Sequence, residues 1–212
     1  MNRLFTFAFL SASLMAFAAC GNRPSTTEPD SKGVEIFFAD PTVFVENGKY
    51  YLSGTRNQEP LGFALLESDN LKEWHYARPD SMIMVCGRQT FGDKGFWAPQ
   101  FFNLGDKYLY LYTANEQVAV AAGDSIEAVY TQTAVAPLDA SEKNIDPYLF
   151  RDDDGKYYLY HVRFDHGNFL WVAEFNPETG TLVDGTLQRV FKNDQAWEDT
   201  GAYPSDPIME GP

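Results

Sequence analysis

Positive charge is scarce in this sequence of 212 residues, which carries 16 lysine and arginine residues against 30 aspartate and glutamate residues. The formal net charge of −14 would repel the phosphates of nucleic acid, so we expect no nucleic-acid partner. Histidine is also rare, and His75, His161 and His166 have no spacing typical of a metal site. We therefore predict no metal-binding set among them. The acidity itself mainly favours solubility, and it does not argue against binding of uncharged ligands such as neutral sugars.

Long apolar runs are equally few, and the clearest one covers residues 4–17. It is too short to span a membrane as a helix, and it follows Arg3 as the core of an export signal does. It ends at Ala18-Ala19-Cys20-Gly21, where small residues before a cysteine resemble a bacterial lipobox. This predicts a lipoprotein-type signal peptide over residues 1–20, lipidated at Cys20. The protein would then be exported to the periplasm or outer surface of a bacterial cell envelope, with membrane contact only through the lipid anchor.

Cysteine is nearly absent, and the lipid anchor would use one of the two residues present. Cys86 is then a lone thiol, which is more typical of a packed apolar residue than of a nucleophile. The alternative is an ordinary secretory signal with a chance cysteine at position 20. Residues 21–33 are polar and contain Pro, Ser and Thr, so we predict a flexible tether before a folded domain at 34–212.

Helical periodicity is nearly absent from the expected domain, and short alternating runs with turn residues between them predict an all-β fold. The dipeptide Asn47-Gly48 is typical of a two-residue type I′ hairpin. Three units of four short strands follow from this pattern. The expected strands are 42–46, 49–55, 62–67 and 75–78; 100–104, 107–113, 118–122 and 129–133; and 148–151, 156–162, 169–175 and 187–191.

Each unit opens with a residue followed by proline, and the same kind of opening returns at the C-terminus. The four openings are Asp40-Pro41, Ala98-Pro99, Asp146-Pro147 and Glu210-Gly211-Pro212. Units of this size, each repeating the same hairpin, predict a β-propeller. The chain would supply about three blades and the start of a fourth, which is fewer than a closed ring needs, so we expect a truncated domain or fragment.

Three of these openings carry a carboxylate: Asp40, Asp146 and Glu210. The inner strands of a propeller start around one axis, so these side chains would meet in one pocket. Two carboxylates facing each other provide the acid and the base for glycoside hydrolysis, and a third raises the pKa of a neighbour. Asp before Pro is by itself a common turn element. Ala98 indicates that the blade does not require an acid there.

The motifs Ala39-Asp40-Pro41, Trp97-Ala98-Pro99, Ile145-Asp146-Pro147 and Glu210-Gly211-Pro212, taken in order, resemble glycoside hydrolase family 43. The resemblance implies a five-bladed propeller that cleaves arabinose- or xylose-containing plant polysaccharides and oligosaccharides with inversion. It implies Asp40 as general base, Glu210 as general acid and Asp146 as the residue that tunes and orients Glu210. It requires no cofactor and leaves room for a structural calcium ion.

Trp97 is a candidate for stacking on a sugar ring, with packing between blades as the equal alternative. Asp152-Asp153-Asp154 lies at a predicted hairpin tip and lacks the later ligands of a calcium loop, so a solvated turn is expected. Two other functions stay open: a non-catalytic surface propeller that binds glycans, and an inactive fragment of the enzyme.

Overall fold

The structure is a computed structural model that describes residues 33–191, 195, 197–198 and 208–212. Within these residues it contains strands and turns and no helix, which confirms the all-β prediction. The predicted signal peptide with Cys20 and all but the last residue of the predicted tether lie outside the described residues. The described chain includes no helix long and apolar enough to cross a membrane.

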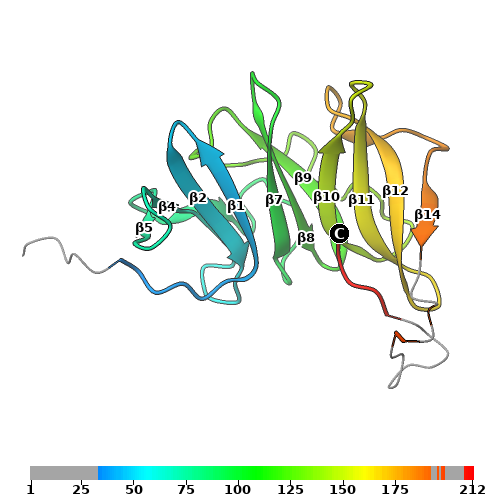
Figure 1. Ribbon diagram of the computed structural model, residues 1–212, viewed down its shortest axis with the longest axis horizontal. Helices are drawn as coiled ribbons and strands as arrows, with labels where there is room; N and C mark the ends of the chain where they lie inside the picture. Colours follow the sequence, from blue (N-terminus) through cyan, green and yellow to red (C-terminus); the bar gives the residue numbers. More distant parts are fainter. Residues whose placement is uncertain (1–32, 192–194, 196, 199–207) are drawn as a thin grey trace, which may run out of the picture. The chain divides into compact units, whose positions relative to one another are not determined.

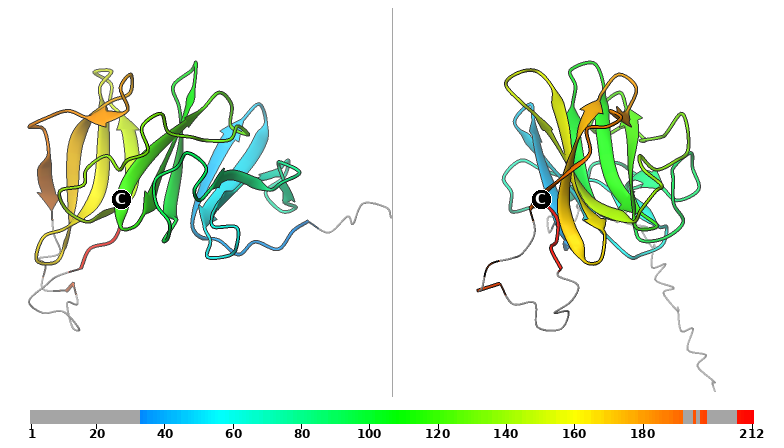
Figure 2. Two further views of the ribbon diagram at one scale, coloured as in Figure 1. Left: turned by 180° about the vertical axis from the view of Figure 1, so that it is seen from behind. Right: turned by 90° about the vertical axis from the view of Figure 1, so that its right-hand side faces the viewer.

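Fourteen strands form three twisted antiparallel blades that follow one another along the chain (Figures 1 and 2). Blade one contains β1 (Ala39–Glu46), β2 (Lys49–Thr55), β3 (Gly62–Ala64), β4 (Leu66–Ser68), β5 (His75–Tyr76) and β6 (Met82–Val85). Blade two contains β7 (Trp97–Asn103), β8 (Tyr108–Ala114) and β9 (Gln117–Gly123). Blade three contains β10 (Asn144–Arg151), β11 (Tyr157–Phe164), β12 (Asn168–Asn176), β13 (Thr181–Leu182) and β14 (Gln188–Phe191).

The first hairpin of each blade forms as the sequence predicts. Glu46 pairs with Lys49 across Asn47 and Gly48, whose φ angles of 50° and 80° are those of a type I′ turn. In blade three, the tip at Asp152-Asp153-Asp154 is a turn whose carboxylates accept hydrogen bonds from the backbone N–H groups of Asp153 and Lys156. The innermost strands β1, β7 and β10 lie side by side, with β7 in the middle.

The outer strands of blades one and two differ from the prediction. The third strand of blade one is broken at Leu65, so β5 pairs with β4 while β6 pairs with β3. The sequence pattern predicted one strand at 75–78 and missed β6, which follows Pro79 and is almost entirely buried. In blade two, the predicted strand at 129–133 is reduced to a single bridge between Ala122 and Thr131.

Residues 129–133 do not form the predicted strand because the backbone N–H groups of Tyr130 and Gln132 bond to partners outside β9. Tyr130 donates to Ile83 O in blade one, and Gln132 donates to Gln89 O, while only Thr131 donates back to β9. The segment therefore links two blades. A pattern of alternating residues predicts an extended chain but not which neighbour it pairs with.

Two apolar layers hold the blades together. Aromatic rings fill the interface between blades one and two, where Phe63, Phe101, Tyr110 and Tyr130 are in edge or tilted contact. Tyr110 is completely buried, and its hydroxyl lies 2.7 Å from Ser53 Oγ. Between blades two and three the core is mainly aliphatic, with Leu109, Leu111, Leu149 and Leu159 buried beside Phe175.

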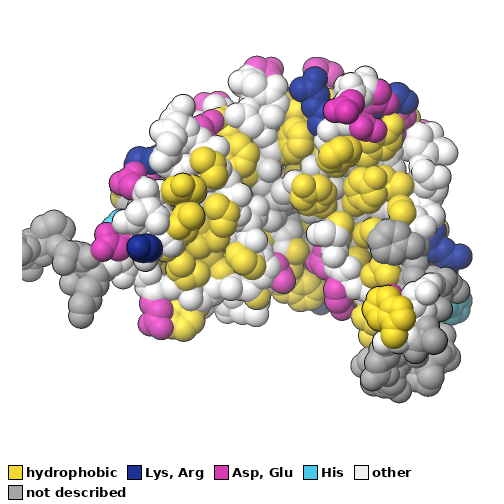
Figure 3. Space-filling model, in the orientation of Figure 1, with side chains coloured by type: hydrophobic (Ala, Val, Ile, Leu, Met, Phe, Trp, Pro, Cys, Tyr) yellow, Lys and Arg dark blue, Asp and Glu magenta, His cyan; other side chains and the backbone are white. Residues whose placement is uncertain are grey.

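Apolar side chains also gather over β1 and over blade three on the face shown in Figure 3. Val43 and Val45 of β1 and Tyr148 and Phe150 of β10 are each about half exposed. A propeller blade buries such residues only by packing against a neighbouring blade.

Candidate active site

A β-bulge opens the inner strand of every blade. The pairing of β1 with β2 shifts between Ala39 and Thr42, and the same shift occurs between Trp97 and Gln100 and between Ile145 and Tyr148. Each bulge holds the dipeptide that ends in proline. Because a bulge leaves its residues unpaired and bends the strand, it redirects the side chain that precedes the proline.

The residue before each proline adopts a left-handed backbone conformation. The φ angles are 45° at Asp40, 42° at Ala98 and 56° at Asp146. A residue with a Cβ rarely adopts this region, and a following proline restricts it further, so each position costs on the order of 1–3 kcal/mol. The same strained geometry at Ala98, which has no reactive group, identifies it as a property of the blade opening. Asp40 and Asp146 are carboxylates placed on this shared backbone position.

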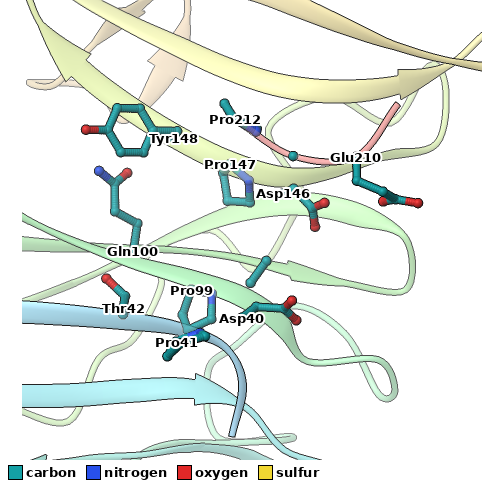
Figure 4. Close-up of a pocket in the computed structure, with 12 residues that line it drawn as sticks. Asp40, Pro41, Thr42, Pro99, Gln100, Asp146, Pro147, Tyr148, Glu210 and Pro212 are labelled. Atoms are coloured by element: carbon teal, nitrogen blue, oxygen red, sulfur yellow. The ribbon is translucent and has the colours of Figure 1, made fainter. Parts of the chain in front are cut away.

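The three openings and the C-terminal segment line one open cavity of about 570 Å³. Three successive residues of each opening line it: Asp40, Pro41, Thr42, Ala98, Pro99, Gln100, Asp146, Pro147, Tyr148, Glu210, Gly211 and Pro212. In Figure 4 the carboxylates of Asp40, Asp146 and Glu210 point to the same side of the prolines. The structure thus places all three predicted acids around one pocket.

Threonine hydroxyls connect successive openings. Thr55 Oγ1, at the end of β2, accepts a hydrogen bond from the N–H of Ala98 at 2.8 Å and donates one to Asp40 Oδ2 at 2.6 Å. Thr113 occupies the same place in β8 and accepts the N–H of Asp146 at 2.9 Å. Val162 stands at the equivalent position of β11, opposite Ile145, and has no hydroxyl.

Burial and like charges raise the pKa of Asp146 to about 6. Burial has the largest effect, followed by the charge of Glu210 and then that of Asp40, while a hydrogen bond from the Gly211 N–H acts in the opposite direction. The charges of Glu210 and Asp40 therefore both act on the carboxyl group of Asp146.

Gly211 lets the C-terminal segment approach this group closely. A Cβ placed on Gly211 would lie 2.6 Å from Asp146 Cβ and 2.9 Å from Asp146 Oδ2. In the alignment of the four openings, Gly211 takes the place of Asp40, Ala98 and Asp146, and Glu210 precedes it. The acid in the C-terminal segment therefore comes from one residue earlier in the motif than the other two.

Trp97 is half-buried, and its ring lies about 3 Å from where a Cβ on Gly95 would be. It is not among the residues that line the cavity, so sugar stacking by Trp97 stays a prediction. Tyr148, which the sequence pattern does not single out, lines the cavity and is half-exposed. Cys86 is half-buried and is a free thiol.

The histidines lie away from the cavity, and burial lowers the pKa of His161 to about 4. Among the described residues, no group of three or more His, Cys, Asp or Glu side chains is arranged to hold a metal ion. The Asp152-Asp153-Asp154 tip caps its own turn. These residues do not fit a calcium site, and we assign no chemistry to a metal.

Sequence patterns did not single out Thr55 or Gln100, and they included Gly211 only as part of the motif Glu210-Gly211-Pro212. Gln100 pairs both ends of its amide with the backbone of Leu149, which joins β7 to β10. A signal for Thr55 does exist, because Thr55 and Thr113 occupy the same place in the matching runs KYYLSGT and KYLYLYT.

Fold and site together define a partial β-propeller with an acidic pocket at the starts of its inner strands. The sequence model of the family described as glycosyl hydrolases family 43 matches residues 34–212, and the chain belongs to that family. Its structural relatives there are five-bladed propellers, of which this chain covers a part. The predicted family and fold are confirmed.

Three relatives illustrate the match. The extracellular endo-α-(1→5)-L-arabinanase 2 of Bacillus subtilis is 26% identical over 87% of this chain and 44% of its own length. The crystal structure of an endo-1,4-β-xylanase from Bacteroides thetaiotaomicron is 36% identical, with a TM-score of 0.70 over 76% of this chain and 55% of that one. A thermostable family-43 glycoside hydrolase is 25% identical, with a TM-score of 0.71 over 86% and 61%. The chain thus spans about half the length of these relatives.

We expect Asp146→Asn to stabilise the full-length protein at pH 7.5 by about 1–2 kcal/mol, after allowance for solvent screening, and to give no such gain at pH 4. Because the folded-state pKa is raised, the stabilising effect of the Asp146 proton is present below pH 4 and is lost as the pH rises through about 6. Asparagine avoids that loss. Denaturant unfolding at both pH values measures the effect, with Asp106→Asn in an exposed turn as the control. An equal gain at pH 4 and 7.5 would contradict the assignment.

Proposed function

We propose that the full-length protein hydrolyses O-glycosidic bonds in arabinose- or xylose-containing plant polysaccharides or oligosaccharides, as an α-L-arabinofuranosidase or β-xylosidase. The observation that supports this most is the convergence of Asp40, Asp146 and Glu210 on one cavity, where burial and the two neighbouring carboxylates raise the pKa of Asp146. The printed names of the relatives, an arabinanase and a xylanase, support the substrate class.

In this proposal Asp40 is the general base and Glu210 the general acid of an inverting reaction. Asp40 takes a proton from water as the water oxygen attacks the anomeric carbon. Glu210 donates its proton to the departing oxygen as the glycosidic bond breaks. Asp146 lies against the Gly211 backbone and accepts a hydrogen bond from its N–H group, so we assign Asp146 the role of orienting and tuning Glu210, the neighbouring residue of that segment. Trp97 is proposed as an aromatic contact for a sugar ring at the rim.

The test is hydrolysis by the full-length protein of aryl α-L-arabinofuranoside, aryl β-xyloside, arabinan and xylan. Proton NMR of the first-formed product reports the anomeric configuration, and we expect inversion. A retained configuration would contradict the assigned roles. Binding of these glycans without turnover would instead support the non-catalytic glycan-binding propeller, and absence of both would support an inactive fragment.

For location, we propose export and anchoring in a bacterial cell envelope through Cys20. The B. subtilis relative is named as extracellular, which supports export. Metabolic labelling with palmitate should give a labelled protein, and Cys20→Ser should abolish the label and release the protein.

Gly211→Ala should lower kcat by about 10–100-fold while the melting temperature changes little. The added methyl group overlaps Asp146 and forces either Asp146 or Glu210 out of position. Steady-state kinetics on the best aryl glycoside measures the effect. Gly155→Ala is the control, because it strains a remote hairpin with a φ of 85° and touches nothing within 4 Å. A wild-type kcat in Gly211→Ala would show that the close approach is not needed.

A further inference from the structure

The Thr55 hydroxyl makes two hydrogen bonds whose directions are fixed by their partners. The Ala98 N–H can only donate, so Thr55 Oγ1 accepts that bond at 2.8 Å. An ionised carboxylate has no proton, so at Asp40 Oδ2, 2.6 Å away, Thr55 must donate. Thr55 as a whole is almost fully buried, which favours one arrangement over exchange with solvent.

We propose that Thr55 is the positioning residue of the catalytic base and that it leaves Oδ1 of Asp40 as the oxygen that takes the proton from water. The inference rests on the function proposed above. Oδ2 is occupied by Thr55, whereas Oδ1 accepts no hydrogen bond from any residue that the structure describes. A carboxylate fixed at one oxygen presents the other in a single direction, as an in-line attack by water requires.

The same contact links the opening of blade one to that of blade two. Thr55 ties the Asp40 carboxylate to the Ala98 backbone of blade two, and Thr113 of blade two accepts the backbone N–H of Asp146. The openings that carry Asp40 and Asp146 are therefore both hydrogen-bonded to blade two, which lies between them. Ala98 keeps the strained backbone of the opening but adds only a methyl group to the cavity.

The experiment compares Thr55→Val, which keeps the shape and removes the hydroxyl, with Thr55→Ser, which restores it. In the full-length protein, Thr55→Val should lower kcat by about 10–100-fold with KM changed less than about twofold. The loss should be the same factor for an activated aryl glycoside and for an oligosaccharide, because water must be activated whatever the leaving group is. Thr55→Ser should recover kcat to within about threefold of wild type.

Ser53→Ala is the matched structural control. Ser53 lies two residues earlier on the same face of β2 and also reaches blade two, where it contacts Tyr110 OH, but it touches no carboxylate. Its loss should lower the melting temperature without lowering kcat.

Three results would overturn the inference while leaving the proposed function intact: a wild-type kcat in Thr55→Val, an equal loss in Ser53→Ala, or no recovery in Thr55→Ser. A wild-type protein that hydrolyses none of the four substrates would instead refute the proposed function. Should Thr55→Val not fold, Thr55→Cys, which offers only a weak donor, takes its place with the same deciding outcomes.

Discussion

Glu210→Gln is expected to lower kcat for xylobiose or arabinobiose by about 10²–10⁴-fold, whichever sugar the wild-type protein cleaves. Glutamine keeps the size and the hydrogen-bonding reach of the side chain but has no proton to give to the departing oxygen. A sugar oxygen leaves poorly without that proton. The 2,4-dinitrophenyl glycoside leaves readily on its own, so its hydrolysis should fall by less than about tenfold.

The comparison of the two substrates distinguishes a lost acid from a damaged site. A damaged site would slow both substrates to the same extent. Glu178→Gln, at an exposed turn of blade three, is the matched control and should behave as wild type on both. Equal losses on the two substrates in Glu210→Gln would assign the acid to a different residue.

Asp40→Asn is expected to lower kcat by about 10³–10⁴-fold on both substrates, without the rescue seen for Glu210→Gln. The amide cannot accept a proton from water, and an activated leaving group does not replace that step. Substrate affinity, measured by calorimetry, should stay within about threefold, because the amide occupies the same space and its oxygen still accepts the Thr55 hydrogen bond.

Asp153→Asn, at the exposed hairpin tip of blade three, is the control for the loss of one negative charge. If Asp40→Asn retained more than about a tenth of wild-type kcat, Asp40 could not be the base. Loss of binding together with turnover would point to a role in holding the sugar.

The first hairpin of each blade and the convergence of the three carboxylates could be predicted from the sequence for a physical reason. Hairpins such as the one at Asn47-Gly48 depend on backbone preferences of adjacent residues, and these are local. The opening motif repeats, and the geometry of a propeller turns repetition along the chain into convergence in space. Repetition of the motif therefore predicts that Asp40, Asp146 and Glu210 meet in one pocket, and all three line the same cavity.

The contacts that depend on partners distant in sequence could not be predicted. The run at 129–133 has the pattern of a strand, yet it divides its hydrogen bonds between β9 and blade one. Thr55 looks like an ordinary strand residue in the sequence. Its proposed role in positioning Asp40 depends on a hydrogen bond from Ala98, 43 residues away. Gly211 is informative only once Asp146 is known to lie against it.

The strained opening shared by Asp40, Ala98 and Asp146 means that the backbone and the chemistry are independent of each other in this fold. The bulge, the left-handed φ and the proline give each blade an equivalent backbone position, from which one side chain projects toward the cavity. Asp40 and Asp146 place a carboxylate at this position, and Ala98 places only a methyl group there. Because this position repeats from blade to blade, single substitutions can change the number and placement of charges around the cavity. The hairpins that form the blades would stay the same.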